Sequence, residues 1–156
     1  MELNQKQKNL LKELMEKSAE RGNLANAGLV IENGKTIASD ESLVASNYDA
    51  TDHSERMLVS EVCRIKESHY TPGLTMVTVV EPCLMCMSAC SQAGYKELAY
   101  IIPAKKYLGK VPYITDIKEN LNKNKIAESF IEPIKLIYLS EYREEFSELF
   151  EELMVI

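Results

Sequence analysis

The pattern of hydrophobic positions predicts a helix and then a strand pair at the start of the chain. Leucines and a methionine recur at helical spacing over residues 3–21, and a glycine follows as a stop signal. Two short β-prone runs, 28–32 and 35–39, flank Asn33-Gly34, a dipeptide typical of tight hairpins. We expect these two runs to pair as antiparallel strands.

The rest of the chain alternates between helical and extended patterns. Residues 74–80 form a continuous apolar run, which is typical of a strand covered on both faces. Prolines or glycines end most of the segments. The predicted elements are, in order, a helix over 53–67, a strand over 74–80, a helix over 83–93, a strand over 98–102, a short helix within 117–130, a strand over 134–139 and a last helix over 142–153.

This order of elements predicts an α/β fold with three layers, in which a five-stranded mixed sheet lies between helices. The third and fourth strands are joined through a helix and should be parallel. The long segment before the fifth strand gives room for a crossover, so a parallel fifth strand is expected as well. The sequence has no internal repeat and no linker, so we expect residues 1–156 to form a single domain.

Composition and charge narrow the function classes. Of the 156 residues, 46% are hydrophobic and 27% are charged, as in ordinary soluble proteins. No apolar run is long enough for a membrane span, and the charged N-terminal segment has no secretion-signal core, so a cytoplasmic protein without a membrane partner is expected. The net charge of −6 argues against a phosphate-backbone partner, although lysines are concentrated in residues 96–125.

Cys83 and Cys86, which follow Pro82, are the first candidates for chemistry. They lie where a buried strand gives way to a helix, the edge at which open α/β sheets bind ligands. A helix N-terminus lowers the pKa of a thiol and favours the thiolate that binds metal. Taken alone, the two cysteines are also consistent with a redox pair, half of a structural zinc site or two small core residues.

His53 and Glu55 are the second pair of candidates, at the start of a helix that the fold should bring to the same edge. A histidine and two cysteines would leave one zinc position open, which distinguishes a catalytic zinc from a structural one. Glu55 would then stand beside the open position as a proton carrier. The alternative is that Asp52 and Glu55 form a capping box.

A structural metal site would need a fourth ligand, and three other residues offer one. Cys90 and Cys63 lie on predicted apolar helix faces, where a core position is expected, and His69 precedes a turn, where a solvated loop position is expected.

Together, His53-Ser54-Glu55 and, about thirty residues later, Pro82-Cys83-x-x-Cys86 resemble the motifs of the cytidine/deoxycytidylate deaminase superfamily. The resemblance covers most of the chain, because the predicted order of elements also matches the cytidine deaminase-like fold. The Glu-Pro-Cys-x-Met-Cys sequence and residues 49–55 look most like the branch of tRNA adenosine deaminases and guanine deaminases. Relatives in this branch form dimers, so a homodimer is expected.

The resemblance implies a hydrolytic deamination that uses one Zn²⁺ with a bound water. His53, Cys83 and Cys86 would hold the ion, whose charge lowers the pKa of the water. Glu55 would take the proton of the water and return it to the base and to the departing ammonia.

Several residues beside the implied pocket depart from the usual Asp-Pro-Thr-Ala-His-Ala-Glu of the branch. Ala50 replaces the proline, and Asp52 and Ser54 replace the two alanines. The residue between histidine and glutamate normally offers backbone contacts to the base, so Ser54 is a candidate for substrate binding. The branch places a substrate-holding asparagine about ten residues before the histidine, where residues 42–43 are serine and leucine. The nearest asparagine, Asn47, is the other candidate.

The sequence is consistent with three functions, which differ in the molecule that the protein would bind. Deamination of a free nucleobase or nucleoside is favoured, because residues 91–93 are uncharged where the tRNA enzymes are basic, and the last helix is acidic. The alternatives are a tRNA-specific adenosine deaminase and a non-catalytic, zinc-stabilised binding domain. By analogy with the family, Phe146, Phe150 or another aromatic residue of the last helix is expected to cover the base.

Overall fold

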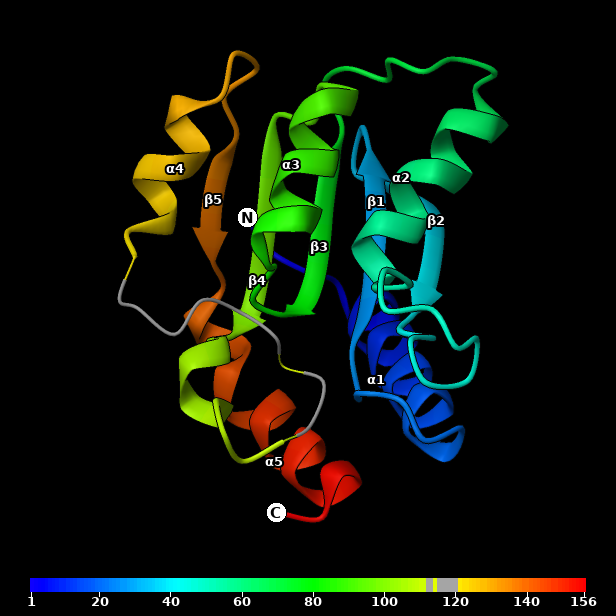
Figure 1. The fold of residues 1–156 in the computed structure, drawn as a ribbon, viewed down its shortest axis with the longest axis vertical. Coiled ribbons are helices and arrows are strands. Elements are labelled where there is room, and N and C mark those ends of the chain that lie inside the picture. Colours follow the sequence, from blue (N-terminus) through cyan, green and yellow to red (C-terminus); the bar gives the residue numbers. More distant parts are fainter. Residues whose placement is uncertain (112–113, 115–120) are drawn as a thin grey trace.

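The computed structural model describes residues 1–111, 114 and 121–156, and in this part of the chain five strands form one mixed sheet (Figure 1). The sheet order is β2-β1-β3-β4-β5, with β1 antiparallel to β2 and β3, and with β3, β4 and β5 parallel. These findings confirm the predicted hairpin, the mixed sheet and the parallel fourth and fifth strands. The strands are β1 (Ala27–Glu32), β2 (Lys35–Glu41), β3 (Thr75–Val80), β4 (Glu97–Ile102) and β5 (Lys135–Tyr138).

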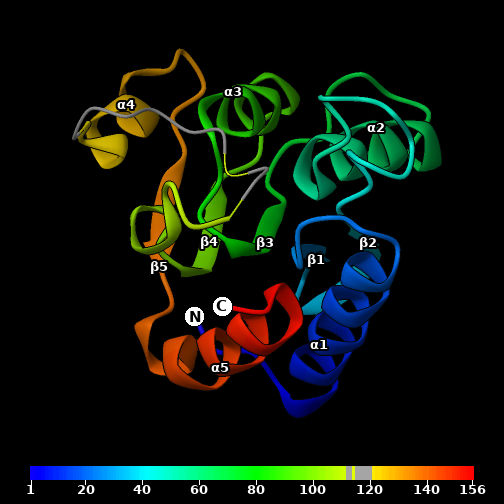
Figure 2. The same cartoon turned by 60° about the horizontal axis from the view of Figure 1, so that its bottom comes forward.

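Helices cover both faces of the sheet, as predicted (Figure 2). The first and last helices lie on one face, and the three middle helices lie on the other. The predicted helix within 117–130 is observed only in its second half, and its residues 117–120 lie outside the described residues. The helices are α1 (Gln5–Glu20), α2 (Ser54–Ile65), α3 (Leu84–Ala93), α4 (Lys123–Ser129) and α5 (Arg143–Met154), with 3-10 turns η1 (Ala104–Tyr107) and η2 (Ser140–Tyr142).

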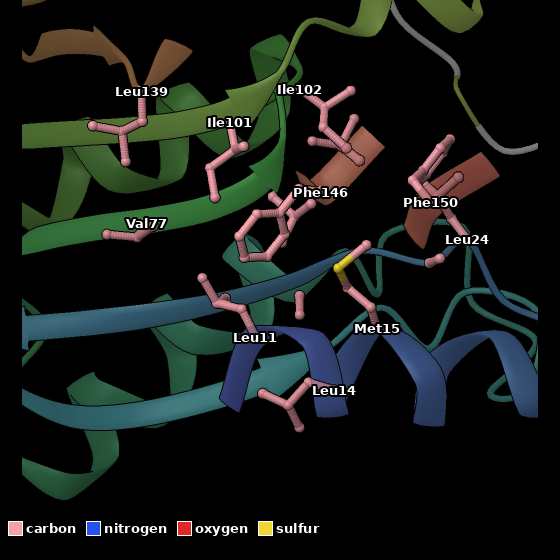
Figure 3. Packing of buried hydrophobic residues seen from close by; sticks show 14 of the residues in the cluster. Leu11, Leu14, Met15, Leu24, Val77, Ile101, Ile102, Leu139, Phe146 and Phe150 are labelled. Atoms are coloured by element: carbon pink, nitrogen blue, oxygen red, sulfur yellow. The ribbon is translucent and has the colours of Figure 1, made fainter. Parts of the chain in front are cut away.

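Two hydrophobic cores follow from this layering, one on each face of the sheet. Strand β3 is buried at every position, and its side chains contribute to both cores, Val77 and Val79 to one and Met76 to the other. Figure 3 shows the core beneath α1 and α5, where Leu11 and Met15 of α1 lie below Val77 of β3. Because β3 packs against side chains on both of its faces, the C-terminal end of this strand is held in a fixed position.

Two glycines, Gly34 and Gly28, occupy positions in the β1–β2 hairpin where the backbone conformation or close packing requires glycine. Gly34 and Asn33 both have positive φ, 78° and 51°, as a tight hairpin requires. A Cβ on Gly28 of β1 would lie 3.0 Å from Leu58 of α2 and 3.0 Å from the carbonyl oxygen of Val77. The bare backbone at residue 28 thus lets α2 pack directly against β1.

No helix in the described ranges is long and apolar enough to cross a membrane.

A carboxyl cluster between α2 and β2 is expected to make stability depend on pH. Burial, and then a hydrogen bond with Asp40 of β2, raise the pKa of Glu61 from its ordinary value to about 8. The unfolded chain releases this proton at a lower pH. The stability that the protonated group contributes is therefore complete below its ordinary pKa and is lost as pH rises through about 8.

We expect Glu61→Gln to remove this pH dependence. The variant should gain on the order of 1 kcal/mol or less at pH 8, because the half-exposed group is partly screened by solvent. Urea unfolding at pH 5 and pH 8 measures the effect. An equal loss of stability between the two pH values in both proteins would contradict the assignment.

Candidate active site

Three side chains from two helix starts meet at the C-terminal edge of β3. The Sγ atoms of Cys83 and Cys86 lie 3.7 Å apart, and Nδ1 of His53 lies 3.5 Å and 3.6 Å from them. All three ligand atoms lie within 4.8 Å of one another, and they form the one such group of potential metal ligands among the residues that the structure describes.

These distances fit a tetrahedral zinc ion. With Zn–S near 2.3 Å and Zn–N near 2.1 Å, tetrahedral angles put two thiolates about 3.8 Å apart and a thiolate about 3.6 Å from an imidazole nitrogen. The three observed separations are within about 0.1 Å of these values. Two thiolates and one imidazole are also a ligand set that zinc prefers, and three protein ligands leave a fourth position open.

Local sequence explains why the three ligands converge. Pro82 follows β3 and cannot extend it, and the chain turns there into α3 with Cys83 as its N-cap. His53 is likewise the N-cap of α2, with an extended backbone at φ −69° and ψ 143°. Figure 1 shows both helices starting at the edge where β3 ends. The positive ends of two helix dipoles therefore face the cluster and favour thiolates.

The pKa values of Cys83, Cys86 and His53 leave one thiolate in the cluster, which favours the binding of a cation. The pKa of Cys83 is lowered to about 4, first by the hydrogen bond from the Cys86 thiol and then by the His53 ring. The same thiol–thiol contact raises the pKa of Cys86, and the hydrogen bond with Cys83 raises that of His53. Cys83 is thus the thiolate of the group, and binding of a metal ion would release the remaining protons.

Glu55 lies in the first turn of α2 and is 2% exposed. Its Oε1 accepts hydrogen bonds from Nδ2 of Asn26 at 3.1 Å and from Oγ of Ser54 at 2.5 Å. Its negative charge is among the lesser causes that raise the pKa of His53 and of Cys86. A buried carboxylate at this position can exchange a proton with a molecule bound at the open metal position.

The capping box that competed with this arrangement is not formed. The N-cap of α2 is His53, and no side chain caps this helix. The carboxylate of Asp52 instead accepts hydrogen bonds from Asn47 at 3.0 Å and from Arg56 at 2.6 Å. Glu55 therefore does not cap the helix, and its carboxylate makes hydrogen bonds to Asn26 and Ser54 instead.

The structure also places the two proposed substrate contacts. Ser54 is fully buried, and its hydroxyl donates to Glu55. Asn47 lies in the loop before α2, where its amide is engaged with Asp52. Ser42, one of the two residues at the family's asparagine position, is 3% exposed, and its backbone N–H donates to the carbonyl oxygen of Asn26.

The other potential ligands lie outside the cluster. Cys90 is fully buried among the core residues beneath α3, as expected, and His69 is exposed after α2. Cys63 lies on α2 and is partly buried. These positions disfavour a closed four-ligand site built from these residues.

The expectation that Phe146 or Phe150 covers the base is wrong. Both side chains are fully buried in the core between α5 and the sheet, and Figure 3 shows Phe146 pointing toward Leu11 and Val77. The ring of Phe150 packs against Tyr107 with centroids 4.8 Å apart. Burial of these large rings holds α5 on the sheet, so they are not available to a ligand.

Asn26 contacts Glu55 in the structure but was not among the residues predicted from the sequence. It is 5% exposed and joins the start of β1, the end of β3 and Glu55. The available signal was a single polar residue between Ala25 and Ala27 at the start of an apolar strand. A polar side chain in such a position needs hydrogen-bond partners, but the sequence does not say which ones.

Lys123 of α4 supports the backbone just before the cysteines. Its Nζ donates to the carbonyl oxygen of Pro82 at 2.9 Å and pairs with the carboxylate of Glu81 at 2.6 Å. Both side chains are largely buried, with 11% and 16% exposed. This contact ties a helix from the C-terminal third of the chain to the loop that carries Cys83.

We expect Lys123→Met to weaken zinc binding by about tenfold, since changes to residues that orient metal ligands cost about 10–100-fold in affinity. The methionine keeps the apolar stem but leaves Glu81 without its cation. Competition with a chelator of known affinity measures the change, and the exposed Lys125→Met is the matched control. Equal affinities for both variants would contradict a supporting role.

Comparisons with known proteins agree with this geometry. Residues 1–102 match the sequence model of the family described as "Cytidine and deoxycytidylate deaminase zinc-binding region". A tRNA-specific adenosine deaminase of Aquifex aeolicus is 25% identical over 100 residues, which are 64% of this chain and 66% of that protein. A guanine deaminase of Bacillus subtilis is 26% identical over 72 residues, 46% of each chain.

Among solved structures, a guanine deaminase from Nitrosomonas europaea has the same fold. It superposes with a TM-score of 0.79 at 18% identity, covering 95% of this chain and 82% of that one. The family match spans more than half of the chain, from α1 to the end of β4, and includes all three clustered ligands. The chain therefore belongs to the cytidine and deoxycytidylate deaminase family of zinc-binding hydrolytic enzymes.

Proposed function

We propose that this protein hydrolytically deaminates a free nucleobase or nucleoside and releases ammonia. The observation that carries the proposal is the meeting, at one sheet edge, of the His53–Cys83–Cys86 cluster and the buried carboxylate of Glu55. A purely structural zinc site needs no buried carboxylate beside it, whereas a hydrolytic site needs a proton carrier there.

Each residue has a role in this reaction. His53, Cys83 and Cys86 would hold zinc, which would lower the pKa of water and so supply hydroxide near neutral pH. Glu55 would accept one proton of the water and pass it to a ring nitrogen of the base, and would later carry the second proton of the water to the departing amine. One carbon–nitrogen bond breaks and one carbon–oxygen bond forms, so one water is consumed for each ammonia released.

Charge favours a small substrate over RNA. The chain has a net charge of −6, and residues 141–152 carry six acids and one arginine. Lysines in residues 96–125 were the argument for RNA, but Lys106 pairs with Glu151 at 3.7 Å and Lys123 with Glu81 at 2.6 Å. Lysines held by carboxylates on the same protein contribute less to phosphate binding.

A tRNA-specific adenosine deaminase is the second candidate. It is favoured by the similar curated proteins, most of which, including those of Aquifex and Buchnera, are tRNA-specific adenosine deaminases. In either case, Ser54 and Asn47 are proposed substrate contacts, and a single domain over residues 1–156 that forms homodimers in the cytoplasm is the proposed assembly.

An ammonia-release screen tests the proposal. Cytosine, adenine, guanine and their nucleosides are incubated with zinc-loaded protein, and tRNA is examined in parallel for conversion of adenosine to inosine. We expect ammonia from at least one free base or nucleoside. Inosine in tRNA without ammonia from the small molecules would favour the second candidate, and neither product would favour a zinc-stabilised binding domain.

A further inference from the structure

Asn26 lies next to Glu55 of the candidate site, just before β1 begins. Its backbone is held by Ser42, whose N–H donates to the Asn26 carbonyl oxygen at 3.0 Å. Its side chain is almost completely buried, at 5% exposed for the residue. The proposed reaction has so far given this carboxamide no role.

The direction of the carboxamide is fixed by the neighbouring strand. Its Oδ1 accepts a hydrogen bond from the backbone N–H of Val80 at 2.9 Å, at the end of β3. A backbone N–H can only donate, so the amide oxygen must face Val80 and the amide NH₂ must face the other way. On that side, Nδ2 lies 3.1 Å from Oε1 of Glu55.

The carboxylate of Glu55 is consequently held asymmetrically. Both Asn26 Nδ2 and Ser54 Oγ donate to the same oxygen, Oε1. An oxygen that accepts from two donors keeps its lone pairs toward them and is a poor place for a proton. The terminal torsion of a glutamate is otherwise broad, and the two oxygens would exchange places freely.

We propose that Asn26 is a positioning residue for proton transfer, which fixes Oε1 so that Oε2 of Glu55 takes and returns the proton. This inference rests on the proposed function, because it assumes that Glu55 carries the proton. Fixing the carboxylate in advance spares the reaction the cost of orienting it, and a misplacement of about 1 Å can cost about 100-fold in rate.

The competing explanation is that Asn26 only satisfies the backbone N–H of Val80. Two variants separate the explanations. Asn26→Ala removes both contacts, whereas Asn26→Asp keeps the size and the acceptor for Val80 but lacks the amide hydrogens that reach Glu55.

For both variants at pH 8 we expect kcat to fall about 30–100-fold, with KM changed less than about threefold and with one zinc ion still bound per chain. Wild-type kcat in Asn26→Asp would overturn the inference.

Unfolding provides a readout that does not depend on turnover. Asn26→Ala and Glu55→Ala, alone and combined, form a double-mutant cycle, for which we expect coupling of about tenfold in the unfolding equilibrium constant. Asn23→Ala is the matched control, because Asn23 is also buried but bonds to the loop residues Ala45 and Ser46. The change that Asn23→Ala causes in the free energy of unfolding should simply add to the change caused by Glu55→Ala.

The outcomes distinguish this inference from the proposed function. An active wild-type enzyme with an equally active Asn26→Ala variant, or additive effects of Asn26→Ala and Glu55→Ala, would overturn the inference alone. Strong coupling in a zinc-loaded protein that releases no ammonia would support the Asn26–Glu55 pair and overturn the proposed function.

Discussion

Replacing Glu55 by alanine should lower turnover by about 10³-fold or more while zinc stays bound at one ion per chain. Loss of a general acid–base typically costs about 10²–10⁴-fold, and here one carboxylate is proposed to serve every proton transfer. Removal of a 2%-exposed side chain that accepts two hydrogen bonds will also change stability, so the variant must be assayed well below its melting temperature. Ammonia release and metal analysis of the same preparation measure the two effects.

Glu61→Gln is the matched control for this experiment. Glu61 lies on the same helix but faces Asp40 of β2, away from the metal ligands. Its substitution should leave turnover within about twofold of wild type, the range in which surface changes usually fall. Near-normal turnover in Glu55→Ala would remove Glu55 from the mechanism.

Replacing Cys86 by serine should abolish stable zinc binding and lower stability at the same time. Cys86 is fully buried and lies 3.7 Å from Cys83 and 3.6 Å from His53, and among the described residues no further histidine, cysteine or carboxylate joins this cluster. Zinc at about a thousand times its Kd stabilises a folded protein by about 4 kcal/mol. We therefore expect zinc content below about one-tenth per chain and a melting temperature about 10 °C lower.

Cys90→Ala separates this effect from ordinary core damage. Cys90 is one turn further along α3, fully buried, and outside the ligand cluster. The variant should lose about 1 kcal/mol for the vacated volume and keep its zinc. Full zinc content in Cys86→Ser would contradict the assignment of the ligands.

Much of the fold could be predicted because its signals are local. The Asn33-Gly34 turn, the uninterrupted apolar run of β3 and the proline after it each specify a short segment, and the strand order then follows from chain connectivity. The convergence of His53, Cys83 and Cys86 was also predictable, since the three residues lie at two helix starts that a parallel arrangement brings to one edge.

Contacts between distant segments were not predictable in this way. The bonds from Asn26 to Glu55 and from Lys123 to Pro82 join residues 29 and 41 positions apart. Their partners depend on side-chain placement in the folded chain, and nothing in the local pattern encodes it. The error over Phe146 has a related cause, because the apolar stripe of an amphipathic helix looks the same whether it packs on a core or covers a ligand.

We propose that the His53–Cys83–Cys86 cluster holds a catalytic zinc. Ammonia release from a free nucleobase or nucleoside should be measured on the zinc-loaded protein, after removal of zinc by a chelator, and after titration with zinc. We predict that activity disappears with the metal and returns in proportion to zinc, reaching its full value at one ion per chain. Unchanged activity in the stripped protein, or no activity in the fully loaded protein, would show that this cluster does not hold a catalytic zinc.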